Sequence, residues 1–416
     1  MGSGQRENGA KRRWARGADG CSTKWRLAAA TDRAGGKALP WLARGANNRG
    51  MSKNLFSSLR LGAIEIPNRV VMAPMTRCRA TPEGCLTALT AEYYRQRAGA
   101  GLIISEATQV SQQGIGYPCT PGIYTREHVE AWKPVVRAVH DAGGKMYCQL
   151  WHCGRVSHNE FQAGGVAPVS SSAVGKGGEV YTYTGPKPYP EPRALEMGEI
   201  AGVIEQYRHG AKMAQEAGFD GVELHGANGY LPDQFLRDGV NRRTDEWGGS
   251  IENRSRFMLE VMRALVAVWG ADRVGVRLSP CGTFNDMSDS QPRATFAYVV
   301  KALGGMGLAY LHIMEAMEGD LKHGKGWPSW ESIPVSYFRP MFTGPLITNA
   351  GFTKEKAEAY IARGDCDAVA FGVPYIANPD LVERFRTGAA LAVPDVSTFY
   401  AGGARGYTDY PAMVKG

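Results

Sequence analysis

Three features that this chain of 416 residues lacks narrow the class of protein to which it belongs. Its eight cysteines are scattered, with no Cys-x-x-Cys pair and no spacing typical of a disulfide framework. No apolar run approaches the roughly 20 residues that a transmembrane helix requires, and no apolar signal-peptide core follows the basic start. These absences predict a cytoplasmic protein with reduced thiols that does not cross a membrane.

A net charge is also missing from most of the chain. The formal charge of +8 at pH 7 comes from residues 1–50, which hold 11 Lys or Arg residues against 3 Asp or Glu residues. The remainder carries 37 basic and 37 acidic residues, so the body of the protein has no excess positive charge for binding nucleic acid. We therefore expect small-molecule chemistry, with no nucleic-acid partner and no membrane partner.

Residues 1–50 are rich in Arg, Gly and Ala and show no apolar periodicity, which predicts a disordered basic leader. Acidic residues are scarce in it, as in organellar transit peptides, but it has only two serines. Organellar targeting and an inert extension therefore both stay open. The rest of the chain, residues 51–416, is expected to form one domain.

From residue 69 onward, short β-branched runs alternate with longer segments of helical periodicity, as in repeated βα units around a parallel sheet. Strands are predicted at 69–76, 101–108, 145–152, 220–226, 274–280, 308–316, 344–351 and 367–374. Helices are predicted at 87–98, 127–142, 197–217, 251–269, 353–363 and 379–386. Eight such units predict an α/β protein with a single (β/α)8 TIM barrel. A doubly wound sheet is the alternative, but no Gly-x-Gly-x-x-Gly turn follows a strand here.

Two segments fall outside the βα pattern. Gly62–Asn68 precedes the first strand and predicts an N-terminal hairpin that closes the barrel floor. Gly154–Glu196 follows the third strand and contains too many prolines and glycines for a barrel helix, so we expect a capping excursion over the barrel mouth. Neither segment is expected to form a separate domain.

The turn after the fourth strand carries the most reactive group of side chains. His225 and Asn228 can both donate hydrogen bonds to one carbonyl or nitro oxygen, and Tyr230 offers a phenolic proton of high pKa. A His-x-x-Asn turn alone is more often a structural pair, so its meaning depends on what else lies at the same face. Arg277 is a second sign of a functional site, because a charge inside the apolar run 274–278 must meet an anion or a buried carboxylate.

Several longer motifs belong together. They are Ala73-Pro74-Met75-Thr76-Arg77, Ser105-Glu106-Ala107-Thr108-Gln109, Gln149-Leu150-Trp151-His152, Gly154-Arg155, the turn from His225 to Tyr230, and residues 242–254. Jointly they resemble the Old Yellow Enzyme family of flavin-dependent ene-reductases, from about Leu55 to Tyr410. Thr76 after Pro74-Met75 is similar to the branch that includes plant oxophytodienoate reductases and bacterial maleimide reductases.

The resemblance implies non-covalent FMN across the barrel mouth. The residues expected to contact the flavin ring are Ala73, Pro74, Met75, Thr76, Ala107, Gln149, His225 and Arg277. Those expected around its phosphate are Asn349, Ala350, Gly351, Phe371, Gly372 and Val373. Thr76 would tune the redox potential through a hydrogen bond, and Arg277 would stabilise negative charge on the reduced ring.

Val373 departs from the family pattern, in which an arginine stands at this position. The missing cation predicts weaker retention of FMN than is usual in the family. The alternative is that a nearby base, either Arg405 or Lys354, compensates for it.

The resemblance also implies a ping-pong reaction in which NADPH reduces FMN and leaves before an activated alkene takes its place. His225 and Asn228 would polarise the carbonyl or nitro oxygen, and Tyr230 would protonate the α-carbon. The residues expected to surround the substrate are Thr76, Tyr117, Trp151, His225, Asn228, Tyr230 and Tyr407. Tyr183, Tyr189 and Trp327 are expected to shape it further.

Two other classes stay open. One is an FMN barrel with a different activity, such as a dehydrogenase or isomerase, which should lack the combined His225, Asn228 and Tyr230. The other is a barrel that has lost its flavin and serves as a binding protein. No metal site is expected. The alkene, the stereochemical outcome and the choice between monomer and homodimer are left open by the sequence.

Overall fold

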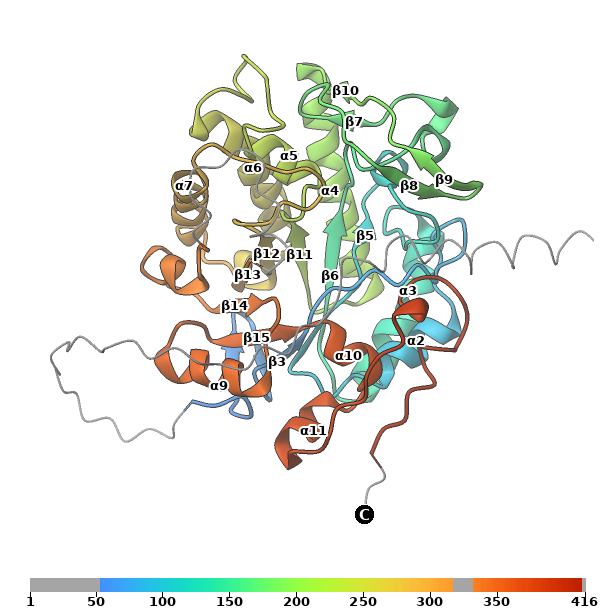
Figure 1. The fold of residues 1–416 in the computed structure, drawn as a ribbon, viewed down its shortest axis with the longest axis vertical. Coiled ribbons are helices and arrows are strands. Elements are labelled where there is room, and N and C mark those ends of the chain that lie inside the picture. Colours follow the sequence, from blue (N-terminus) through green and yellow to red (C-terminus); the bar gives the residue numbers. More distant parts are fainter. Residues whose placement is uncertain (1–52, 317–331, 414–416) are drawn as a thin grey trace, which may run out of the picture. The chain divides into compact units, whose positions relative to one another are not determined.

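The computed structural model describes residues 53–316 and 332–413, and the chain from Asn54 onward forms one compact unit. Eight parallel strands lie at its centre (Figure 1). They are β3 (Val70–Met72), β4 (Leu102–Ile104), β6 (Met146–Trp151), β11 (Gly221–His225), β12 (Val274–Leu278), β13 (Tyr310–Met314), β14 (Leu346–Asn349) and β15 (Ala368–Phe371). β15 pairs with β3 and β6 pairs with β11, so the sheet closes into a barrel.

Each strand lies within a predicted range, which confirms the (β/α)8 barrel over a doubly wound sheet. The strands read as apolar runs because both of their faces are covered, and every residue of β3, β4, β6 and β12 is buried. The second range is interrupted after β4: a further short strand, β5 (Thr108–Gln109), pairs with β6.

Helices follow the strands and surround them (Figure 1). They are α2 (Ala88–Arg95), α3 (Arg126–Asp141), α4 (Met197–Ala217), α5 (Leu231–Leu236), α6 (Ile251–Trp269), α7 (Pro292–Gly304), α9 (Lys354–Arg363), α10 (Val373–Ala377) and α11 (Leu381–Thr387). Short 3-10 helices lie at Gln112–Gly114, Asn159–Phe161, Ala163–Gly165, Ala271–Arg273, Val335–Met341 and Val396–Thr398. Thr125, Ser250 and Thr353 begin α3, α6 and α9, where each side chain accepts a backbone N–H three residues on.

The predicted floor hairpin is confirmed. β1 (Leu59–Leu61) pairs antiparallel with β2 (Ile64–Ile66). Its apolar side chains pack in one cluster with the rings of Tyr147 and Tyr310, which lie 5.7 Å apart inside the barrel. Side chains therefore fill the lower part of the barrel, as is usual for this fold.

The segment after β6 forms the predicted excursion. It contains β7 (Val169–Ser170) parallel to β10 (Arg193–Ala194) and an antiparallel hairpin of β8 (Glu179–Thr182) and β9 (Gly185–Pro188). Arg155, whose side chain is buried, donates hydrogen bonds to the carbonyls of Gly175 and Asn285. This arginine ties the excursion to the loop after β12.

Candidate active site

Most predicted site residues lie where strands end. His225 and Trp151 are the last residues of β11 and β6, and Asn349 and Phe371 are the last residues of β14 and β15. Arg277 lies near the end of β12 and pairs in register with His225. Because the strands are parallel, their carboxyl ends meet at one face, which is where (β/α)8 enzymes carry their active sites.

Four rings pack together at this face. Trp151 stacks on Tyr117 with 5.6 Å between ring centroids and meets Tyr230 edge-on at 4.9 Å. His225 lies 4.8 Å from the Tyr230 ring, and Tyr230 Oη donates to Tyr117 Oη at 3.5 Å. Trp151 is 1% exposed, so it supports the other rings. The side chain of Tyr189 packs against the same group.

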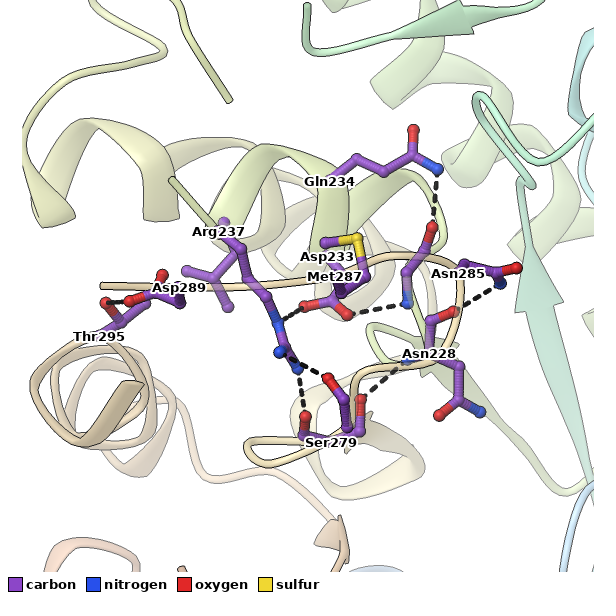
Figure 2. Close-up of polar contacts among 12 residues, drawn as sticks. Asn228, Asp233, Gln234, Arg237, Ser279, Asn285, Met287, Asp289 and Thr295 are labelled. Carbon is purple, nitrogen blue, oxygen red and sulfur yellow. Dashed lines mark hydrogen bonds and ion pairs between the residues drawn. The ribbon is translucent and has the colours of Figure 1, made fainter. Parts of the chain in front are cut away.

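The turn that carries Asn228 is held by the neighbouring loop (Figure 2). Asn228 has a φ of 60°, a left-handed conformation that asparagine adopts more readily than most residues. Its backbone N–H donates to Ser279 Oγ at 2.8 Å, and its carbonyl accepts from Asn285 Nδ2 at 2.9 Å. The carboxamide makes none of the contacts drawn in Figure 2. The loop therefore fixes the backbone of Asn228, and none of these contacts uses its carboxamide.

A buried ion pair supports the same turn (Figure 2). Asp233 on α5 and Arg237 directly after it pair at 2.8 Å, with side chains 0% and 3% exposed. Asp233 also accepts the backbone N–H of Gly229 at 2.9 Å, and Arg237 donates to the carbonyl of Gly282 at 2.9 Å. Because each charge has further partners, the pair links the turn after β11 to the loop after β12.

Burial sets the protonation of His225 and Tyr230. It lowers the pKa of His225 well below the usual value, and the charge of Arg277 lowers that pKa further. Burial raises the pKa of Tyr230 well above that of an ordinary phenol. At neutral pH, His225 is therefore a neutral imidazole with one N–H, and Tyr230 keeps its proton. This pair can polarise an oxygen through His225 and donate a proton from Tyr230.

Several buried polar atoms at this face have no partner within the described ranges. They are Nδ1 of His225, Nε1 of Trp151 and Nε of Arg277. Buried groups of this kind destabilise a protein by about 1–3 kcal/mol each, so a set of them is typical of a ligand site. A flat ring with carbonyl oxygens and ring nitrogens along one edge would satisfy such atoms. The residues present therefore fit the pyrimidine edge of a flavin.

The residues expected along the flavin ring border this group. Ala107 packs in one cluster with Trp151 and Tyr230. Met75 lies across from the loop after β15: a Cβ added to Gly372 would meet its sulfur at 3.5 Å. In the segment after β3, Ala73 is buried, and the next three residues, Pro74, Met75 and Thr76, are half-buried.

The residues expected around the phosphate lie on the loops after β14 and β15, which are neighbouring strands. Ala350 and Gly351 have φ angles of 101° and 64°, so the chain turns sharply after Asn349. Helix α10 begins after Gly372 with Val373, whose side chain is 43% exposed. Backbone N–H groups at such turns suit an anion, whereas Val373 supplies no charge.

The two bases considered as substitutes for an arginine at position 373 make other contacts. Arg405 is 82% exposed and pairs with Asp395 at 3.3 Å. Lys354 Nζ lies 6.0 Å from the centre of the Phe56 ring. These contacts do not involve the loop after β15, and compensation by either side chain stays a prediction.

Tyr407 does not lie where the sequence predicts. Its side chain is 0% exposed and stacks on Tyr93 at 4.0 Å, with the guanidinium of Arg79 4.4 Å from its ring centre. These contacts leave it no surface for a substrate, which corrects the expectation. The residue of the same segment that acts on Tyr230 is Tyr400, which is 59% exposed and adds to the effect of burial in raising the pKa of Tyr230. The sequence offers no means of telling the two tyrosines apart.

Two buried arginines hold this C-terminal segment through its main chain. Arg77 donates to the carbonyls of Phe399 and Gly406, each at 2.9 Å. Arg79 donates to the carbonyl of Thr398 at 2.9 Å. The position of Tyr400 therefore depends on contacts with backbone atoms on both sides of it.

The cysteines, possible metal ligands and helix lengths bear on expectations beyond the site. The cysteines within residues 53–316 and 332–413 are all free, and those ranges contain no group of His, Cys, Asp and Glu able to hold a metal ion. No helix in the described part of the chain is long and apolar enough to cross a membrane. The predicted leader and Trp327 lie outside the described residues.

Comparison with known proteins gives consistent results. Residues 54–392 match the model of the NADH:flavin oxidoreductase / NADH oxidase family. 12-oxophytodienoate reductase 7 of Oryza sativa subsp. japonica is 46% identical over 373 residues, which cover 86% of this chain and 94% of the relative. Morphinone reductase in complex with tetrahydroNAD has a TM-score of 0.81 at 48% identity, covering 87% of this chain and 98% of the other. The old yellow enzyme homologue from Zymomonas mobilis has a TM-score of 0.82 at 43% identity, covering 86% and 100%.

Proposed function

Since the chain belongs to the NADH:flavin oxidoreductase / NADH oxidase family, as an Old Yellow Enzyme relative that reduces activated alkenes with FMN, we propose that NADPH is its reductant and that His225, Asn228 and Tyr230 carry the alkene reaction. The observation that carries this proposal is the grouping of His225 and Tyr230 beside buried donors that lack a partner. The substrates would be α,β-unsaturated carbonyl or nitro compounds.

The flavin would be held without a covalent bond. Arg277 and Gln149 would contact its pyrimidine edge, Thr76 its other carbonyl, and the main chain after β14 and β15 its phosphate. FMN, when bound, would accept hydride from the nicotinamide and pass it to the β-carbon of the alkene. The nicotinamide complex of morphinone reductase supports a reductant of this class.

The alkene oxygen would accept hydrogen bonds from His225 and Asn228. Two donors aimed at one oxygen stabilise the negative charge that develops there. Tyr230 would give its phenolic proton to the α-carbon and recover one from solvent, so that the product gains one hydrogen on each carbon. Thr76 and Tyr117 would border the substrate, and Trp151 would support that wall from behind Tyr117 and Tyr230.

The proposal also covers the domains, the compartment and the oligomeric state. We propose residues 51–416 as the catalytic domain and residues 1–50 as a basic leader, which either directs the protein to an organelle or is an inert extension. The enzyme would act in the cytoplasm as a monomer or homodimer.

The deciding experiment is an anaerobic visible spectrum of the FMN-saturated, desalted protein, recorded before and after NADPH and again after a cyclic enone. The proposal expects bound flavin that bleaches with NADPH and recovers its colour with the enone. Bleaching without recovery would favour another FMN oxidoreductase. A protein that stays apo in excess FMN would favour the binding protein.

Replacing Val373 with arginine is expected to tighten FMN binding about tenfold or more. A charge-assisted contact to the phosphate contributes roughly 1.5–3 kcal/mol, and every 1.4 kcal/mol changes the dissociation constant tenfold. Fluorescence titration of the apoprotein with FMN measures the change. Val373→Gln is the matched control, since it adds length without charge. An equal affinity in the Arg and Gln variants would contradict the prediction.

Neither His225 nor Tyr230 is expected to change its protonation between about pH 6.5 and 10. Neither residue should therefore make the rate of the alkene half-reaction depend on pH in this range. The lowered pKa of His225 keeps its imidazole neutral above about pH 6.5, and the raised pKa of Tyr230 keeps its phenol protonated up to about pH 10. Stopped-flow measurement of flavin reoxidation across this range tests it.

One neighbouring group does titrate in this range. Burial raises the pKa of Glu106 to about 7. A break in the profile near pH 7 that disappears in Glu106→Gln belongs to that carboxyl. A break that persists in Glu106→Gln would contradict the prediction for His225.

A further inference from the structure

A carboxylate lies buried in the middle of the barrel wall. Glu223 belongs to β11, between Val222 and Leu224, and is 0% exposed. It pairs in register with Gln149 on β6, so the two side chains project from neighbouring strands at the same level. Arg277 stands one strand further round and two residues nearer the mouth, since Glu223 is in register with Gly275.

Glu223 is surrounded by hydrogen-bond donors. Gln149 Nε2 donates to Glu223 Oε1 at 2.7 Å. His312 Nδ1 lies 3.0 Å from Glu223 Oε2, and because a carboxylate accepts, this nitrogen carries the hydrogen. Burial lowers the pKa of His312, so its imidazole is neutral. Each of the two carboxylate oxygens of Glu223 therefore accepts a hydrogen bond from another strand of the barrel.

Arg277 does not form a contact ion pair with Glu223 within the described residues. Its Nη2 donates instead to Asn349 Oδ1 at 3.2 Å. The two charges still act on each other, since Glu223 raises the pKa of Arg277 against the effect of burial. A buried anion and a buried cation therefore face the same region from adjacent strands, each held by neutral groups.

Burying a carboxylate is costly, and packing an apolar side chain there would avoid that cost. We propose that Glu223 is a positioning residue for the flavin, which orients the Gln149 amide and lowers the reduction potential of FMN by placing a negative charge opposite Arg277. This inference rests on the proposed placement of FMN at Gln149 and Arg277.

The orientation follows from hydrogen-bond chemistry. An amide can present either its NH2 or its carbonyl to a neighbour. Glu223 accepts from Gln149 Nε2, so Gln149 Oε1 is turned away from the carboxylate. The flavin pyrimidine edge offers one N–H between two carbonyls, and an amide carbonyl is the partner that this N–H needs. A glutamine in place of Glu223 could donate as well as accept and would no longer select one orientation.

The effect on the potential follows from charge. Reduction adds negative charge to the pyrimidine ring, which Arg277 stabilises and Glu223 opposes. Both side chains are buried, so water screens them little. Removing the Glu223 charge should therefore favour the reduced flavin.

The test is the midpoint potential of the FMN-loaded Glu223→Gln protein, measured anaerobically against a redox dye. We expect the reduction equilibrium to shift about tenfold toward the reduced form, a rise of about 30 mV for a two-electron couple. Glu223→Asp keeps the charge and is expected to stay near the wild-type potential. A potential in Glu223→Gln equal to that of the wild type would overturn the proposal, as would equal shifts in both variants.

A second variant covers failure of Glu223→Gln to fold. Gln149→Leu removes the oriented carbonyl and is expected to raise the FMN dissociation constant at least severalfold, and an unchanged constant would overturn the orienting role. The proposed function is judged separately: a wild-type protein that stays apo in excess FMN refutes the placement itself. If the wild type bleaches with NADPH and the Glu223→Gln protein has an unchanged potential, this inference alone is refuted.

Discussion

Replacing Tyr230 with phenylalanine is expected to slow reoxidation of the reduced enzyme by an enone about 10²–10⁴-fold, the usual contribution of a positioned acid. Phenylalanine keeps the ring that packs against Trp151 and His225 and removes the proton donor. Reduction of the flavin by NADPH needs no proton from this residue and should keep its rate. Stopped-flow absorbance resolves the two half-reactions separately.

Tyr117→Phe is the matched control for this variant. Tyr117 lies beside Tyr230 and receives its hydrogen bond at 3.5 Å, so the change removes a second phenol from the same place. It is expected to change the alkene half-reaction far less than Tyr230→Phe does. Equal losses in both half-reactions of Tyr230→Phe would show that Tyr230 shapes the site and is not the acid.

Replacing Asn228 with glycine is expected to slow the alkene half-reaction about 10²–10³-fold, the usual loss when one of two donors to a developing oxyanion is removed. Glycine is the appropriate replacement because Asn228 has a φ of 60°, which glycine adopts without strain. The contacts of Ser279 and Asn285 with the backbone should also survive. The measurement is the single-turnover rate with an enone, together with urea unfolding.

Asn228→Ala separates the lost donor from backbone strain. It should lose rate to the same extent as the glycine variant and in addition lose about 1–2 kcal/mol of folding free energy, because alanine is strained at this φ. If the glycine variant turns over the enone at the wild-type rate, the carboxamide does not contact the substrate oxygen.

The barrel could be predicted from the sequence because its strands are local apolar runs. Val70–Met72 and Leu102–Ile104 are buried on both faces, so no polar residue interrupts them. The floor hairpin was predictable for a similar reason: Leu61 and Ile66 alternate with polar residues toward a turn at Gly62. Each of these features depends on neighbours in sequence.

The site was predicted only in part, because some of its contacts join distant segments. His225 and Tyr230 share one turn, so their proximity could be inferred. Ser279 and Asn285, which hold Asn228, lie more than 50 residues away and carry no motif that names this role. Glu223 could have been found by the same reasoning as Arg277, since a charge within an apolar strand needs buried partners.

The C-terminal segment around Tyr400 is recognised through atoms that every residue possesses. Arg77 and Arg79 bind the carbonyls of Thr398, Phe399 and Gly406, so exchanging the side chain at position 400 alters none of these bonds. Substitutions at that position would therefore leave intact the main-chain bonds that hold the segment. Under the proposed function, position 400 is where the selectivity for alkenes can be varied without removing the contacts that hold the segment.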